Sequence, residues 1–274
     1  MSDSTNTTVV FITGVGRGMD FLIYLFLTTE VLTFANFTGI GRSILEAFLL
    51  RPNYIVIGSV RDKTSEKYEE LKRLPTAYGS RLLLISIDST NMDDPQASIK
   101  DIEAEGITHV DVVIANAGIT PSAGPLDKVA IQDVSDALSI NAMSPIQLYH
   151  ATRPLLEKSS RPVWFSMTSA AGSIGNVEMH NAHFLLAYGI SKATMNFFTK
   201  PVHAAHANWI AYAVHPGLVR SEMGNEGARL QGLEKAPVTL EDCATNILAP
   251  IDGATRGKTS GRFLNFTDNS ELPW

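Results

Sequence analysis

The sequence predicts a single α/β domain built on a doubly wound parallel sheet. Three observations predict this fold: short apolar runs alternate with helical patterns along the 274 residues, each run ends at a small or polar residue, and a glycine-rich turn follows the first run. Runs that are apolar nearly throughout are typical of parallel strands, because helices cover both faces of such a sheet. The length suits one core, so we expect residues 1–274 to form one domain.

The expected strands are short, and each is followed by Gly, Asn, Ser or Pro. They are Val9–Ile12, Tyr54–Val60, Arg81–Ile87, Val110–Ala115, Val163–Met167, Ile210–Val214 and Arg262–Asn265. The helical patterns between them include Arg42–Leu50, Thr64–Leu74, Asp133–Leu156, Tyr188–His206 and Leu240–Leu248. Strands alternating with helices indicate a parallel sheet, and ligands of such sheets bind at the carboxyl ends of the strands.

Composition excludes several function classes. With 45% apolar and 18% charged residues the chain has a globular composition. Its formal net charge of −6 argues against nucleic acid as a partner, which requires a basic face. Cys243 is the only cysteine, so no intramolecular disulfide forms, and residues Met1–Thr8 lack the pattern of a signal peptide. We therefore expect a cytoplasmic protein.

One segment does not fit the pattern. Residues Met19–Thr38 read MDFLIYLFLTTEVLTFANFT and separate the first strand from its helix, where a tight turn is expected. The apolar run from Phe21 to Phe37 is interrupted by Glu30. A membrane-spanning helix needs roughly 20 apolar residues and tolerates a central Glu poorly, so we do not interpret this anomalous apolar insertion as a membrane span.

The insertion divides a glycine-rich motif. TGVGRG, residues 13–18, precedes it and GIGR, residues 39–42, follows it; removing residues 19–39 gives TGVGRGIGR. This text matches T-G-x-x-x-G-x-G, in which glycines let the backbone approach a pyrophosphate at a helix N-terminus. We therefore interpret residues 19–39 as a translated, unspliced intron of 63 nucleotides in frame. The alternative is a genuine loop insertion.

Several further motifs occur in order along the chain: Asn116-Ala117-Gly118, Tyr188-x-x-x-Lys192 and Pro216-Gly217. With them the chain resembles the short-chain dehydrogenase/reductase family from end to end, apart from the insertion. The C-terminal third, with GARL at 227–230 and LPW at the end, is more particularly similar to fungal norsolorinic acid ketoreductases. This resemblance implies a Rossmann fold and NADPH-dependent reduction of a ketone to a secondary alcohol. It suggests an aromatic polyketide ketone of fungal secondary metabolism as the substrate, and a homodimer or homotetramer.

The expected chemistry centres on Tyr188 and Lys192. A tyrosine hydroxyl can protonate a carbonyl oxygen, and a lysine one helical turn away supplies positive charge that lowers the phenol pKa. Such a pair alone is common on helix surfaces, but Ser169 upstream favours the catalytic interpretation. The family's serine hydrogen-bonds the substrate oxygen about 13 residues before the tyrosine, whereas Ser169 lies 19 residues before Tyr188. Thr168 and Ser173 therefore remain alternatives.

The resemblance also implies the cofactor contacts. Arg17 and Arg61 suit the 2′-phosphate of NADP(H), since a guanidinium pairs with phosphate oxygens; the alternative is two solvated arginines. Asn141 would kink a helix and support a proton-relay water beside the lysine. The other implied cofactor contacts are Gly14, Gly18, Ile40 and Gly41 of the loop, Asp88 near the adenine, Asn116 beside the cofactor, Val219 and Ser221 at the nicotinamide, and Tyr188 and Lys192 themselves.

A metal site and an inactive protein are the two other interpretations of this sequence. Five histidines, His180, His183, His203, His206 and His215, suggest a metal, but no cysteine or carboxylate cluster accompanies them. We expect packed or solvated side chains and no metal site. The competing function is a catalytically impaired, reductase-like protein whose cofactor loop is split.

Overall fold

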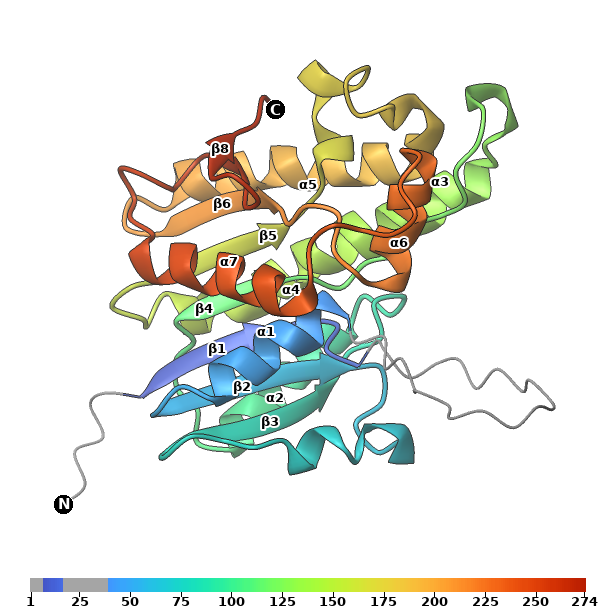
Figure 1. The fold of residues 1–274 in the computed structure, drawn as a ribbon. Coiled ribbons are helices and arrows are strands. Elements are labelled where there is room, and N and C mark those ends of the chain that lie inside the picture. Colours follow the sequence, from blue (N-terminus) through green and yellow to red (C-terminus); the bar gives the residue numbers. More distant parts are fainter. Residues whose placement is uncertain (1–6, 17–38) are drawn as a thin grey trace, which may run out of the picture.

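The structure is a computed structural model that describes residues 7–16 and 39–274. The predictions for Arg17, Gly18 and residues 19–38 therefore lie outside the described residues. The described strands form one sheet in the order β3-β2-β1-β4-β5-β6-β7-β8 (Figure 1). They are β1 (Thr8–Ile12), β2 (Tyr54–Val60), β3 (Arg81–Ser86), β4 (Val112–Ala115), β5 (Val163–Met167), β6 (Ile210–His215), β7 (Phe263–Asn265) and β8 (Ser270–Glu271).

The predicted doubly wound parallel sheet is confirmed. Every neighbouring pair is parallel except β7 and β8. β1 pairs with β2 on one side and with β4 on the other, so the strand order reverses beside β1. A crevice for ligands opens where the order reverses, at the carboxyl ends of the strands. The glycine-rich turn follows β1 at this point.

Helices cover both faces of the sheet. In Figure 1, α1 (Ile40–Leu49) and α7 (Leu240–Gly253) lie in front. Their buried side chains, such as Phe48 and Ile247, share one core with alternate strand residues. On the other face α2 (Asp94–Ala104), α4 (Ser144–Leu156) and α5 (Leu186–Ala205) bury a second core. Two further helices are α3 (Ile131–Leu138), which packs on α5, and α6 (Glu222–Leu230) after β6.

One helix prediction was wrong. The stretch Thr64–Leu74 contains two short 3₁₀ turns, Glu66–Tyr68 and Leu71–Arg73, instead of an α-helix. The buried Tyr68 and Leu71 are three residues apart, which suits a 3₁₀ spacing, and Leu74 is extended because it precedes a proline. The stretch Asp133–Leu156 is helical throughout, and a π-helical turn, Ser139–Met143, lies between α3 and α4 at Asn141, where a kink was expected. Among the described residues no helix is long and apolar enough to cross a bilayer.

Candidate active site

The carboxyl ends of β1 and β4 are tied together by side chains. Thr13 Oγ1 accepts hydrogen bonds from the backbone amides of Asn116 and Ala117, each at 3.0 Å. Asn116 Nδ2 donates in return to the Thr13 carbonyl at 2.9 Å. These bonds join the carboxyl ends of β1 and β4, where the glycine-rich turn begins. Asn116 was expected at this place, beside the cofactor.

The described parts of the glycine-rich loop make a close cradle. Gly14 has φ of +72°, and a Cβ there would lie 2.9 Å from Ala117 Cα. A Cβ at Gly41 would lie 2.5 Å from Asn116 Nδ2 and 2.7 Å from the Gly14 carbonyl oxygen. Neither position has room for a side chain. Helix α1 starts at Ile40 without a side-chain cap, so the cradle fits a pyrophosphate group against backbone amides.

Tyr188 and Lys192 lie one turn apart on α5. Lys192 Nζ stands 5.6 Å from the centre of the Tyr188 ring and donates a hydrogen bond to the Met167 carbonyl at 3.0 Å. Burial lowers the pKa of Lys192 to about 8, so its ammonium form still dominates at neutral pH. The structure thus brings together the two residues that the i, i+4 spacing had paired.

The pKa of Tyr188 moves in the direction opposite to our expectation. Burial raises it to about 12, and the hydroxyls of Ser169 and Thr120 oppose only part of that rise. The free energy lost when water is removed from around a phenolate exceeds the free energy that hydrogen bonds from the surrounding side chains supply. Tyr188 therefore keeps its proton at neutral pH, which is the state that a proton donor requires.

Ser169 follows β5 and faces Tyr188. Its Oγ accepts a hydrogen bond from the Ala171 amide at 3.2 Å. Its hydroxyl also opposes the rise in the pKa of Tyr188 that burial causes. The alternatives occupy other places: Ser173 Oγ donates to the Pro273 carbonyl at 2.6 Å, and Thr168 Oγ1 is buried without a hydrogen-bond partner among the described residues. Ser169 is thus the one of the three that interacts with the phenol.

Asn141 lies in the π-helical turn Ser139–Met143 between α3 and α4. Its Oδ1 accepts from the Ile119 amide at 2.7 Å, while its Nδ2 donates to the Ile119 carbonyl at 2.8 Å and to Ser191 Oγ at 2.9 Å. A Cβ at Gly118 would lie 3.0 Å from Asn141 Oδ1 and 3.5 Å from Lys192 Nζ. Asn141 thus joins the loop after β4 to α5 beside the lysine.

The ends of β2 and β3 carry opposite charges. Arg61 Nε lies 3.8 Å from Asp88 Oδ2, and 72% of the Arg61 side chain is exposed. Asp62 does not compete for this place, because its Oδ1 accepts hydrogen bonds from both the amide and the hydroxyl of Thr64. Those bonds lower the pKa of Asp62. The guanidinium of Arg61 is therefore exposed at this edge, and its ion pair with Asp88 is a long one.

Val219 and Ser221 lie between β6 and α6. Val219 is buried, and Ser221 Oγ accepts from the Gly224 amide at 3.1 Å and so caps α6. Both residues stand after the strand that neighbours Ser169, on the same edge of the sheet. The structure thus aligns the described members of the predicted cofactor set along one edge.

Among the described residues no group of three or more His, Cys, Asp or Glu is arranged to hold a metal. His206 stacks on Trp209 at 3.8 Å, and His203 Nδ1 shares a hydrogen bond with Ser260. His180 Nε2 and His215 Nδ1 are buried without a hydrogen-bond partner in the described part of the chain.

The buried imidazole of His215 makes stability depend on pH. Burial, and to a smaller extent His180, lowers its pKa to about 4, below its unfolded value near 6.5. Between these two pH values the unfolded chain binds a proton at His215 and the native chain does not. We therefore expect the free energy of unfolding to fall by up to about 3 kcal/mol as pH falls from about 6.5 to about 4. Urea unfolding across this range measures it. His215→Gln should flatten the slope and the exposed His150→Gln should not; an unchanged slope in His215→Gln contradicts the assignment.

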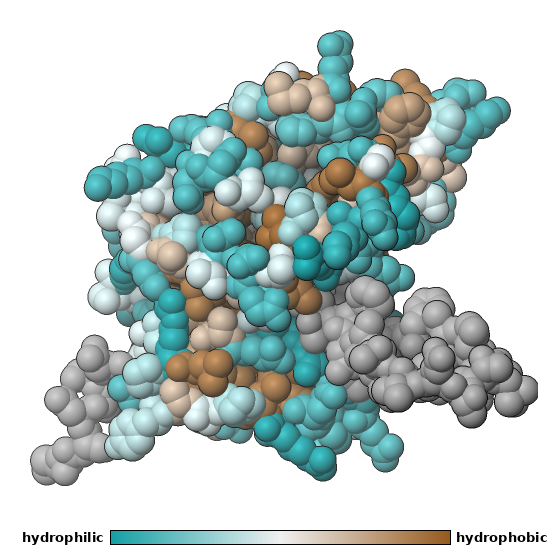
Figure 2. Space-filling view, in the orientation of Figure 1, coloured by the Kyte–Doolittle hydropathy of each residue, from teal (hydrophilic) through white to brown (hydrophobic). Residues whose placement is uncertain are grey.

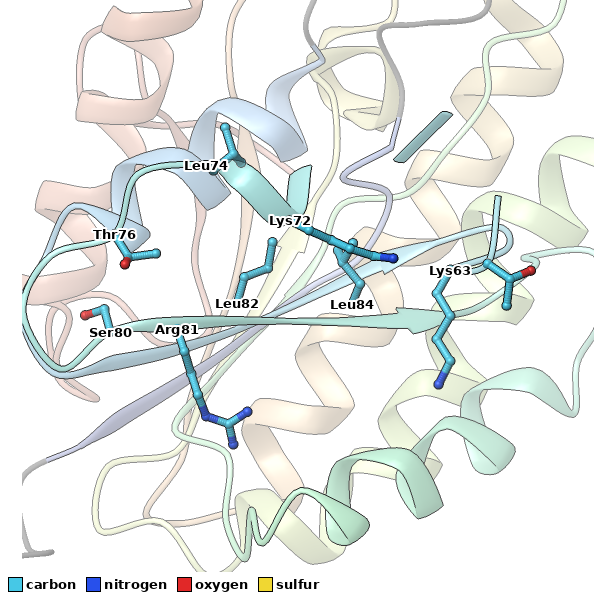
Figure 3. Close-up of a pocket in the computed structure, with 9 residues that line it drawn as sticks. Lys63, Lys72, Leu74, Thr76, Ser80, Arg81, Leu82 and Leu84 are labelled. Carbon is cyan, nitrogen blue, oxygen red and sulfur yellow. The ribbon is translucent and has the colours of Figure 1, made fainter. Parts of the chain in front are cut away.

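A hollow of about 630 Å³ lies at the outer edge of the sheet beside β3. Its cations do not converge: in Figure 3 Lys63 and Arg81 lie on one side of β3 and Lys72 on the other. Each is paired with an acid, Lys63 with Asp101, Arg81 with Glu105 and Lys72 with Glu69. In the sheet, β2, β1 and β4 separate β3, beside which this hollow lies, from β5, which leads to Ser169.

Comparison with known proteins decides the family. The family model described as short chain dehydrogenase matches residues 30–230. The chain belongs to the short-chain dehydrogenase family. It is therefore an oxidoreductase acting on CH–OH or C=O groups, and its membership implies a nicotinamide dinucleotide, which the cradle at Gly14 and Gly41 fits.

Relatives and structures of this dehydrogenase family support the same conclusion. A short-chain dehydrogenase of Neurospora crassa is 42% identical, covering 98% of this chain and 99% of the relative. The norsolorinic acid ketoreductase of Aspergillus parasiticus is 36% identical, over 86% of this chain and 88% of its own. The NADPH-bound carbonyl reductase from chicken fatty liver has the same fold, with a TM-score of 0.77 at 22% identity, covering 98% of this chain and all of that one.

Two residues at the site of this dehydrogenase were not predicted from the sequence. Thr13 was seen only as the start of a glycine motif, although its hydroxyl ties β1 to β4. Thr120, two residues after Gly118, has a buried hydroxyl without a hydrogen-bond partner among the described residues, and it opposes the rise in the pKa of Tyr188. The short distance to Asn116-Ala117-Gly118 was the only signal in the sequence for Thr120.

Proposed function

We propose that this protein reduces a ketone to a secondary alcohol with NADPH. The observation that carries the proposal is the meeting of Ser169, Tyr188 and Lys192 at the carboxyl edge, beside the glycine cradle. NADPH supplies hydride when bound. The residues of the chain then have to bind the carbonyl oxygen, protonate it and replace the proton.

Each residue has one task in this proposal. Ser169 hydrogen-bonds the carbonyl oxygen and Tyr188 gives that oxygen its proton. Lys192, held by the Met167 carbonyl, supports the phenolate electrostatically and contacts the cofactor. Asn141 fixes the loop at Ile119 against α5 and keeps the relay beside Lys192 in place.

NADPH is proposed over NADH because of the groups at the ends of β2 and β3. Arg61 is exposed there, and Asp62 is committed to Thr64. A ribose 2′-phosphate pairs well with a guanidinium, whereas a carboxylate in that place would favour the free hydroxyls of NADH. Asp88, 3.8 Å from Arg61, orients the guanidinium in the absence of phosphate.

Arg61→Asp should weaken NADPH binding at least about tenfold more than NADH binding, since a charge-assisted hydrogen bond contributes about 1.5–3 kcal/mol. Titration of each cofactor by fluorescence measures both dissociation constants. The control is Arg81→Asp, which makes the same charge change at the start of β3, away from the carboxyl ends of the strands. Equal weakening of NADPH and NADH by Arg61→Asp would remove Arg61 from the phosphate site.

We propose an aromatic polyketide ketone as the substrate class. The norsolorinic acid ketoreductase of Aspergillus parasiticus is among the relatives. Exposed apolar side chains occur on the loop before Tyr188 and around α6, including Met179, Leu230 and Leu233. Figure 2 shows hydrophobic surface over α6 and the neighbouring segments. Flat apolar ketones should therefore give higher kcat/KM than short aliphatic ketones of equal reactivity; the reverse order would reject this class.

A catalytically impaired protein is the second candidate. The observation that favours it is the start of the family match at residue 30, which leaves β1 and Gly14 outside the matched region. We propose that residues 19–39 cause this interruption and do not belong to the working enzyme. Either Met19–Gly39 or Gly18–Thr38 can be removed to give the same continuous loop.

A further inference from the structure

The C-terminal segment Leu272–Trp274 follows β8 and is bound to both the sheet and helix α5. The Leu272 amide donates a hydrogen bond to the Phe263 carbonyl at 2.8 Å, which ties the segment to β7. The Trp274 ring packs on the Phe263 ring, with 5.7 Å between the two centroids. The ammonium of Lys200 on α5 lies 4.9 Å from the centre of the Trp274 ring, and a cation over an indole face is attracted to it. The segment therefore has a fixed place beside the helix that carries the catalytic pair.

The same segment binds the loop that leads from β5 to α5. Ser173 Oγ donates a hydrogen bond to the Pro273 carbonyl at 2.6 Å, and the Gly175 amide donates to the Trp274 carbonyl at 3.2 Å. The Pro273 ring also lies directly on Gly175, since a Cβ on that glycine would be 3.2 Å from Pro273 Cβ. Two hydrogen bonds and one apolar contact therefore fix Ser173 and Gly175 to the C-terminal segment.

The loop that is fixed in this way, residues 173–185, adjoins the active site at both of its ends. It begins four positions after Ser169 and ends three positions before Tyr188. It carries exposed apolar side chains, among them Met179 and Phe184. In the proposed function Ser169 and Tyr188 bind only the ketone oxygen. The rings of an aromatic ketone therefore have to be received by neighbouring segments, and this loop offers apolar side chains for them.

We propose that Pro273 and Trp274 are positioning residues, which hold loop 173–185 in the conformation that receives the aromatic rings of the substrate. This inference rests on the proposed function. A loop without these anchors samples many conformations, and a substrate that binds to it has to order it, which lowers the affinity. An anchored loop is ordered before the substrate arrives. Since the anchors do not touch the reacting atoms, they affect KM and leave kcat nearly unchanged.

The first test is the pair Trp274→Ala and Trp274→Phe, made in the 253-residue form. Trp274→Ala removes the ring contacts with Lys200 and Phe263 and so releases the segment. It should raise KM for naphthyl methyl ketone about tenfold, the effect of losing one shielded cation–aromatic contact. KM for butanone, which is too small to reach the loop, and kcat for both ketones should change by less than about twofold. Trp274→Phe keeps an aromatic face for Lys200 and should restore most of the lost affinity.

Ser173→Ala tests the other end of the same connection, because it removes the hydrogen bond to the Pro273 carbonyl. It should raise KM for naphthyl methyl ketone in the same selective way. Added to Trp274→Ala it should have little further effect, since both changes release the same loop. Tyr78→Ala truncates an exposed ring between β2 and β3 and is the control; it should leave both KM values unchanged.

A readout that does not need turnover separates this inference from the proposed function. Hydrogen exchange in the full 274-residue chain should show faster exchange of the amides of residues 173–185 in Trp274→Ala than in wild type, with the amides of β1–β6 unchanged. No turnover of either ketone by wild type would reject the proposed function. Unchanged exchange of the loop, or equal rises in KM for both ketones, would overturn the positioning role of Trp274 alone.

Discussion

Tyr188→Phe should lower the rate of ketone reduction by roughly 10²–10⁴-fold, the usual contribution of a general acid. The phenylalanine ring takes the same place on α5, and only the hydroxyl is lost. Binding of NADPH should therefore change little. Turnover with an aromatic ketone and cofactor titration, both on the 253-residue form without residues 19–39, measure the two quantities separately.

The matched control is Tyr149→Phe. Its hydroxyl shares a hydrogen bond with His206 Nε2 at 2.7 Å. Tyr149 packs against the core beneath α2, α4 and α5, away from the carboxyl edge. This variant should lose some stability and keep its turnover. Undiminished reduction by Tyr188→Phe would show that another group donates the proton.

Removal of residues 19–39 should convert a chain that binds NADPH poorly into one that binds and turns over. The backbone amides at the start of α1 have to converge with Gly14 on one pyrophosphate. Gly41 already lies against the Gly14 carbonyl in the structure, so the flanks of the insertion hold the positions that a continuous loop needs. An apolar segment of this size would also have to be buried or remain exposed as an adhesive patch.

The 274-residue and 253-residue forms should be compared side by side for NADPH affinity and turnover. A third form, in which a Gly/Ser linker of equal length replaces residues 19–39, keeps the loop split but removes the apolar character. If the division of the glycine-rich loop causes the weak binding, this third form should bind NADPH as poorly as the 274-residue form. The transcript across residues 17–41 provides the independent test. A dominant messenger RNA that retains the 63 nucleotides, with full activity of the long form, would refute the intron interpretation.

The strands were the most predictable part of this fold. All seven predicted runs correspond to β1–β7, with boundaries that differ by at most two residues. A parallel strand buried on both faces is apolar at nearly every position, and this pattern is visible without knowledge of its neighbours. The antiparallel β8, only Ser270–Glu271 and exposed, carries no such signal.

The helices were less predictable because their extent depends on contacts outside their own sequence. Thr64–Leu74 has helix-forming residues, yet Asp62 binds the Thr64 amide and Tyr68 packs against Gly16 and Lys67. The π-helical turn at Asn141 follows from bonds to Ile119 and Ser191, 22 and 50 residues away.

The sequence by itself determined the order of strands and helices, the site of the cofactor turn and the pairing of Tyr188 with Lys192. These depend on local periodicity and on spacing within one helix, which neighbouring residues encode. Only the tertiary structure decided that Ser169 acts on the pKa of the phenol in preference to Thr168 and Ser173, and that the pKa of Tyr188 rises. Each of these depends on burial and on distances between segments far apart in the chain. Desolvation of the Tyr188 phenol, which raises its pKa, exists only once those segments have packed together.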